Sequence, residues 1–202
     1  MSSTGESSWQ LVLPVQITTF VAGPLSRLGH DLTFEGKVQV VCKGSSLSAR
    51  LDVRNLKIAR AARDGVVRQV SERDQSKILG NMLGASVLNA AKNPVIELCV
   101  AVDALSVGAL CSAEEVRTAL VCTEEAGLAV KLSILGCSLD EMLHCQAEGQ
   151  SASLRLDVQP SRYGIAPFRA MLGALQLQDR VGVVVHWPAG AVEETTDLRD
   201  GR

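Results

Sequence analysis

Three histidines and their neighbours are the first candidates for chemistry in this chain. The dipeptides His30-Asp31 and His144-Cys145 contain the residue types of an acid–base pair and of a nucleophile beside its base. Neighbouring residues of a strand point to opposite faces, so neither dipeptide can cooperate if its segment is a strand. His186 alternates with apolar neighbours and is expected to face solvent. The sequence therefore predicts no catalytic residues, and we expect a protein that is not an enzyme.

The six cysteines give no metal-binding pattern. A structural zinc site needs closely spaced pairs, and none of the cysteines belongs to a CxxC pair. Most of them lie in apolar or strand-like runs, which predicts buried free thiols. An enzyme that uses Cys137 or Cys145 is the remaining alternative, and no cofactor or metal is expected. The cysteines are Cys42, Cys99, Cys111, Cys122, Cys137 and Cys145.

Three arginines lie close together near the C-terminal end of the sequence, at Arg162, Arg169 and Arg180. An arginine fork binds phosphate or carboxylate oxygens, so Arg162 and Arg169 are candidates to bind the anionic head group of a ligand. The competing interpretation is a solvated loop face, which the pattern favours.

The composition limits the partners of the protein. A length of 202 residues is typical of one domain with a real core. A net charge of −2 and 3% aromatic residues argue against a nucleic acid partner. No apolar run reaches the length of about 18 residues that a membrane span needs. The polar residues 1–8 resemble no secretory signal, which predicts a cytoplasmic protein. The polar composition of both ends predicts a disordered lead at 1–8 and a disordered tail at 191–202.

Alternating apolar and polar residues recur between these ends and predict a mainly β fold. From Asp31 to Cys42 the alternation is strict, with Gly36 on the apolar face, where a bulge, a bend or a close ligand needs room. Short, evenly spaced strands of this kind indicate an antiparallel barrel or sandwich. The expected strands are 9–21, 31–42, 47–53, 95–102, 128–134, 154–158 and 181–187, with a weaker candidate at 116–122 and an ambiguous segment at 139–148.

Two segments interrupt the strand pattern. Residues 71–91 carry apolar residues at helical spacing, which predicts a helix. Ser71 is a candidate N-cap, with Asp74 in the place of the capping-box acid. Because of Gly80 and Gly84, the segment could form either one long helix or two short ones. The apolar stripe of this helix either closes the barrel or packs on its outside. Residues 165–175 predict a helical turn behind Pro167. The stripe consists of Ile78, Met82, Leu83, Val87 and Leu88.

Three segments, in order, resemble the YceI-like family of lipid-binding proteins. They are SRLGHDLTF at 26–34, NMLGASVLNAAKNPVI at 81–96, and the combination YGIAPF at 163–168, LGAL at 172–175 and DRV at 179–181. The resemblance spans roughly residues 9–187, although the middle of the chain matches weakly. It implies a single antiparallel, lipocalin-like β-barrel of about eight strands with one or two short helices, covering residues 9–190. Members of the family often form dimers, and the sequence leaves a homodimer open.

The resemblance also implies an apolar cavity that holds a long-chain isoprenoid or another amphiphilic lipid. We therefore expect binding, transport or storage of such a lipid without catalysis. The alternative is a filled barrel that acts as an interaction or stress-related module without a lipid. Alternation then selects the inward-facing residues that are expected to line the cavity. These are Leu32, Phe34, Val38, Leu51, Val53, Leu132, Leu156, Phe168 and Val183.

Overall fold

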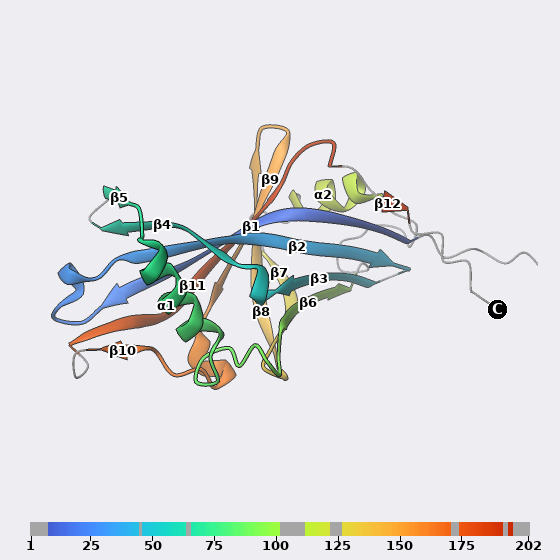
Figure 1. Ribbon diagram of the computed structural model, residues 1–202. Coiled ribbons are helices and arrows are strands. Elements are labelled where there is room, and N and C mark those ends of the chain that lie inside the picture. The colour runs from blue at the N-terminus through green and yellow to red at the C-terminus, as the bar shows by residue number, and fades with distance from the viewer. Residues whose placement is uncertain are drawn as a thin grey trace, which may run out of the picture.

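A computed structural model describes residues 8–44, 46–63, 66–101, 112–121, 127–170, 174–191 and 194–195. Its strands in this part of the chain join into one antiparallel sheet (Figure 1). The strands are β1 (Ser8–Ala22), β2 (Asp31–Lys43), β3 (Ser46–Asp52), β4 (Lys57–Arg63), β5 (Val66–Arg68), β6 (Val95–Ala101), β7 (Leu128–Ile134), β8 (Cys137–Glu148), β9 (Ser151–Val158), β10 (Arg169–Ala170), β11 (Leu175–Trp187) and β12 (Glu194–Thr195).

The sheet closes on itself because β1 pairs with β11 on one side and with β2 on the other. Around the ring the order is β1, β11, β9, β8, β7, β6, β3 and β2, which makes a closed antiparallel barrel of eight strands. Strand β4 pairs with the first half of β2, while β3 pairs with the second half. The predicted lipocalin-like barrel with two helices is confirmed.

Strands β1 and β2 are long and run side by side along the whole molecule (Figure 1). Their register places Leu13 opposite Val38 and Ile17 opposite Phe34. Odd-numbered residues of β1 therefore share the inner face with even-numbered residues of β2, as their alternation predicts. The ambiguous segment 139–148 also resolves as a strand, β8.

The first helix, α1 (Glu72–Leu83), begins where the sequence predicts. The Ser71 hydroxyl accepts a hydrogen bond from the backbone N–H of Asp74 at 3.2 Å, which satisfies one of the free amides of the first turn. The helix passes through Gly80 and ends before Gly84. The glycines left open whether the segment forms one long helix or two short ones. The structure has a single helix of 12 residues, followed by turns.

The weak strand expected at 116–122 is wrong, because α2 (Ala113–Val121) occupies this segment. A capping box explains the helix: the Ser112 hydroxyl accepts from the Glu115 N–H at 3.2 Å, and Glu115 accepts from the Ser112 N–H at 2.7 Å. Its buried residues recur at helical spacing. Cys122, the last residue of the expected strand, lies outside the described residues.

The helical turn expected at 165–175 is also wrong in the part that is described. Residues 165–168 have no regular structure, and β10 follows them, with the Leu177 N–H donating to the Phe168 carbonyl at 2.9 Å. Residues 171–173 lie outside the described part. The sequence also missed β4 and β5. The apolar residues of β4 do not alternate cleanly, because its register with β2 shifts at Thr33/Phe34, and β5 is a run of three exposed residues.

Near the C-terminus, Glu194 and Thr195 pair with Gln10 and Trp9 as β12. The expectation of a structureless tail at 191–202 is therefore wrong for these two residues. Residues 1–7, 192–193 and 196–202 lie outside the described part of the chain. No described helix has the length and apolar character to cross a membrane.

Candidate functional site

The barrel encloses a cavity of about 420 Å³. Side chains from β1, β2, β3, β6, β7, β9 and β11 form its wall. The three-residue helix η2 (Val53–Asn55) and the segment at 165–168 contribute further residues. The fold and this cavity together define a hollow antiparallel β-barrel.

The cavity wall includes every residue that the sequence selected as inward-facing. Leu156 on β9 and Leu51 on β3 come from opposite sides of the ring, yet both reach the same space. Contact of these side chains with a lipid stays a prediction. The nine residues on the wall are Leu32, Phe34, Val38, Leu51, Val53, Leu132, Leu156, Phe168 and Val183.

Half of the barrel is hollow although its side chains point inward. On β11, Val181, Val183 and Val185 line the cavity and stay partly accessible. Their partners on β1, Thr19, Ile17 and Val15, line it too. An inward side chain in a filled core would have neighbours on every side. The sequence analysis did not name Ile17, although its parity on β1 would have identified it.

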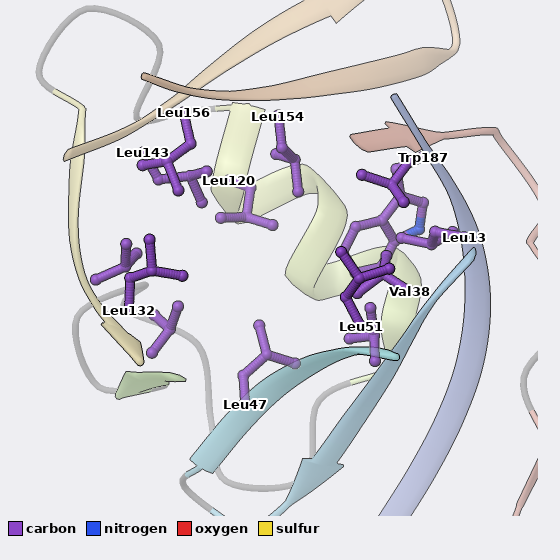
Figure 2. Close-up of a cluster of buried hydrophobic side chains, with 14 of the residues drawn as sticks. Leu13, Val38, Leu47, Leu51, Leu120, Leu132, Leu143, Leu154, Leu156 and Trp187 are labelled. Carbon is purple, nitrogen blue, oxygen red and sulfur yellow. The ribbon is translucent and has the colours of Figure 1, made fainter. Parts of the chain in front are cut away.

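The opposite half of the barrel is filled. The buried cluster in Figure 2 includes Leu13, Leu120 and Trp187 from this half, together with residues of the cavity wall. Trp9 and Trp187 meet edge to face, with ring centroids 6.5 Å apart, and both are almost fully buried. Helix α2 inserts Val116 and Leu120 among the strand side chains. Figure 2 shows Leu120 on this helix, facing leucines from several strands. The filled half forms the floor of the cavity.

The mouth of the cavity lies at the other end, where lining residues reach solvent. Phe168 is 46% exposed, and Asn81 and Gln178 are exposed as well. The apolar stripe of α1 and the turn after it also belongs to the wall, so the interpretation that it covers the barrel interior fits the structure. Four stripe residues line the cavity, and Leu83 packs on the core. The four are Ile78, Met82, Val87 and Leu88.

Gly36 makes room for a neighbouring side chain. A Cβ atom at this position would lie 2.8 Å from the Leu56 Cδ2 atom. Leu56 itself is buried and lines the cavity. Of the roles that the sequence left open for this glycine, the structure shows room for Leu56 against β2.

His30 and Asp31 have separate surroundings. The Asp31 carboxylate accepts a hydrogen bond from the Val21 N–H at 2.8 Å, which ties the two strands together near the mouth. His30 lines the cavity, a placement that the sequence analysis missed. Gly29 packs tightly before it, since a Cβ there would lie 2.8 Å from Val21 and 2.9 Å from Leu175.

The two arginines proposed for a head group do not line the cavity in the described part of the chain. Arg162 forms a two-pronged ion pair with Glu141, with its Nη1 2.7 and 2.9 Å from the two carboxylate oxygens. Arg169 is exposed on β10. A head-group role for either one stays a prediction that the geometry does not favour.

Glu141 also accepts a hydrogen bond from the Tyr163 hydroxyl at 2.9 Å. Burial, together with this bond to a carboxylate, raises the pKa of Tyr163 far above its ordinary value. Tyr163 ends the short helix η4 (Pro160–Tyr163), which leads directly into the mouth segment 165–168. The cluster of Glu141, Arg162 and Tyr163 therefore anchors one side of the mouth to β8.

The cysteines show no reactive arrangement in the described residues. Cys42, Cys99, Cys137 and Cys145 form no disulfide with one another, and burial raises the pKa of the Cys99 thiol, which disfavours its thiolate. Cys145 is buried while His144 is exposed, as expected for neighbours on a strand. Cys111 and Cys122 lie outside the described part. No cluster of three potential metal ligands occurs among the residues described.

Comparisons with known proteins add little to this geometry. No protein-family model matches the chain, and no curated protein matches it. Among solved structures, the crystal structure of BcnA from Burkholderia cenocepacia is similar with a TM-score of 0.42 and 10% sequence identity, covering 87% of this chain and 94% of BcnA. We draw nothing about function from a likeness at this level.

Proposed function

We propose that this protein binds a long-chain isoprenoid or another amphiphilic lipid in the barrel cavity, and carries or stores it without catalysis. The observation that carries the proposal is the cavity itself, about 420 Å³ in volume and walled almost entirely by aliphatic side chains. Binding sites for small molecules commonly have volumes of about 300–1,000 Å³ and mostly apolar walls. The resemblance of three sequence segments to the YceI-like family supports the same ligand class.

The dimensions suit one hydrocarbon chain. The wall runs along β1 from Val15 to Val21, and six residues of strand span roughly 20 Å. With a strand tilt of about 40°, the depth along the barrel axis is roughly 15 Å. This equals half of the bilayer hydrocarbon core of about 30 Å, the depth that one lipid chain fills.

Binding of such a chain requires no specific polar contact. At about 0.3 kcal/mol per heavy atom for a large ligand, a chain of about 20 carbons gains roughly 6 kcal/mol. That free energy corresponds to a dissociation constant of tens of micromolar, on the order of 40 µM. Selection would then depend on the length and width of the chain, because the filled half beyond Val15 and Val185 stops it.

The alternative of a completely filled barrel fits only the half around α2. A filled interior leaves no room for the accessible inward side chains of β11. The lipid-free module therefore has no observation that favours it over the carrier.

Mass spectrometry tests the proposal. The purified protein is extracted with organic solvent, and the intact protein is measured under native conditions with added geranylgeraniol or hexadecanol. We expect one lipid per chain, either retained from the host or taken up on addition. A protein that arrives empty and takes up neither lipid would contradict the proposal.

Two adjacent valines of β11 provide a matched pair of variants. Val183 lines the cavity, whereas Val184 pairs with the exposed Gln16 and Arg155 on the outer face. Val183→Trp should block the cavity and reduce lipid uptake at least about tenfold, because overpacking displaces the chain. Val184→Trp should leave uptake unchanged. Equal uptake by both folded variants would place the lipid outside the barrel.

A further inference from the structure

The polar side chains that the structure describes in the cavity wall carry no permanent charge. In the described part of the chain, the wall contains no Asp, Glu, Lys or Arg. Its hydrogen-bonding side chains are Thr19, His30, Asn81, Gln176 and Gln178. A wall of this composition offers a ligand hydrogen bonds and no fixed counter-charge.

Two of these five side chains already have protein partners. The Thr19 hydroxyl donates to the Leu32 carbonyl at 3.5 Å, and the Gln178 amide donates to the Val21 carbonyl at 3.1 Å. His30, Asn81 and Gln176 make no side-chain hydrogen bond within the part of the chain that is described. We call these three residues the neutral collar.

The neutral collar lies at the mouth of the cavity. His30 immediately precedes β2, whose Leu32 pairs with Thr19, and Gln176 pairs with Ala22 at the same end of β1. Asn81 lies on α1 and is exposed to solvent. The apolar wall extends from this end down to Val15 and Val185, beyond which the barrel is filled, so a chain that fills it leaves its polar end at the collar.

No described arginine near this end lines the cavity, and the exposed Arg27, three residues before His30, is no exception. Arg162 pairs with Glu141, and Arg180 pairs with Asp157 at 3.0 Å while it lies 5.3 Å above the Phe20 ring. Arg169 is exposed and does not line the cavity. An anionic group drawn into the mouth would find amides and an imidazole there rather than an arginine fork.

We propose that the cavity selects lipids whose polar end is uncharged, an alcohol or a carbonyl, over lipids that end in a diphosphate or carboxylate. This inference rests on the proposed lipid-binding function. Amides and imidazole can each donate to and accept from a hydroxyl or carbonyl group. A charge that leaves water without a counter-ion loses far more solvation free energy than it regains from neutral donors.

A competition between two ligands with the same tail tests the inference. Geranylgeraniol and geranylgeranyl diphosphate at equal concentrations compete for the protein, and native mass spectrometry reads which one is bound. Hexadecanol and palmitate repeat the test on a straight chain. We expect each alcohol to bind roughly tenfold more tightly, the effect of about 1.4 kcal/mol of uncompensated charge burial.

A charge placed in the collar should reverse this preference. Gln176→Arg supplies a fork at the mouth and should raise the share of bound diphosphate at least about tenfold, because a bidentate arginine pair is strong. Gln16→Arg places the same charge on the exposed outer face of β1 and should change nothing.

The outcomes are distinguishable. Equal occupancy by alcohol and diphosphate in the unmodified protein, or a preference for the diphosphate, overturns the neutral head group while lipid binding stands. If Arg169→Gln then abolishes that preference, the head group meets β10 instead of the collar. If none of the four ligands binds, the proposed function fails and the head-group inference fails with it.

Discussion

The two halves of the barrel are made from the same strands but are packed differently. Strand β1 contributes Leu11 and Leu13 to the filled half and Ile17 and Thr19 to the hollow half. Leu13 is 1% exposed, whereas the inward residues beyond Val15 stay partly accessible. Alternation along the strand is the same in both halves, so alternation decides which side chains point inward and does not decide whether they fill the interior.

Side-chain volume and one helix account for the difference. The filled half has two tryptophans, and α2 inserts further side chains between the strands. The hollow half has three valines on β11 and a glycine on β2, and α1 contributes to its wall without filling it. Interiors of folded proteins normally pack as densely as organic crystals. A space of this size in a closed barrel is consistent with room kept for a ligand.

The largest expected effect contrasts two leucines, one from each half. Leu13→Ala removes a fully buried side chain and should lower the free energy of unfolding by about 3–5 kcal/mol, because it adds a void to a filled core. Leu32→Ala borders the cavity and should cost roughly 1–2 kcal/mol, since less contact is lost. Urea denaturation of both variants measures the difference. Equal losses would mean that the two halves are packed alike.

A smaller effect concerns the anchor of the mouth. Tyr163→Phe removes the hydrogen bond to Glu141 and should cost about 0.5–1.5 kcal/mol in unfolding free energy. Lipid uptake should change only if the mouth segment 165–168 moves with η4. Glu141→Gln is the companion variant. It removes the carboxylate charge that binds both Tyr163 and Arg162, so it should lower the unfolding free energy more than Tyr163→Phe does.

The same tyrosine predicts a dependence on alkaline pH. Its pKa is raised in the folded state by burial and by Glu141, so its contribution to stability is complete below the unfolded value of about 10 and is lost as pH rises above it. The chain contains one tyrosine, so absorbance at the tyrosinate band reports it alone. We expect tyrosinate to form together with unfolding. Ionisation at an ordinary pH in a protein that stays folded would contradict the buried hydrogen bond.

Gly36→Ala should separate stability from binding. The added Cβ would meet the end of the Leu56 side chain, which has the cavity beside it into which it can turn. We expect a change in unfolding free energy below about 1 kcal/mol and weaker lipid binding, because Leu56 then occupies ligand space. The control is Gly80→Ala in α1, where nothing lies within 4 Å of the new atom. It should stabilise the helix by about 0.5–1 kcal/mol and leave binding unchanged.

The sequence predicts the cavity wall better than it predicts the filled half around α2 or the mouth. Inward residues such as Leu132 and Val183 follow from a period of two, which is local information. Helix α2 was missed because its short apolar run also suits a strand, although Ser112 and Glu115 form a capping box that could have identified it.

The mouth depends on contacts between distant segments, which no local pattern contains. His30 reaches the cavity because β1, β2 and β11 meet there, and Arg162 is drawn to Glu141, 21 residues away in the chain. The hollow half itself was not predictable either, because the space depends on the summed volume of side chains from many strands. Polarity and alternation identify the wall of a barrel, and only the assembled structure gives its volume.

The smallest expected effect lies beside the mouth, at Asp179. Its carboxylate accepts hydrogen bonds from the Ser161 hydroxyl and backbone N–H and from the Gln159 amide at 2.8 Å, and these bonds hold its pKa below the ordinary range. A depressed pKa gives stability that is present above the unfolded value of about 3.9 and is lost as pH falls through the lower folded value.

Asp179→Asn should therefore lower stability slightly at pH 7, where the carboxylate contributes fully, because Asn retains only one acceptor oxygen. It should also flatten the acid limb of the stability curve below about pH 4, where the two proteins become alike. Acid unfolding followed by tryptophan fluorescence measures this, and Asp140→Asn, on an 80% exposed carboxylate of β8, is the control. Because Asp179 ties the segment before η4 to β11, the loss should appear first as faster hydrogen exchange at 159–163. Exchange that rises first in β1 near Trp9 would reverse the order of stability that the filled and hollow halves imply.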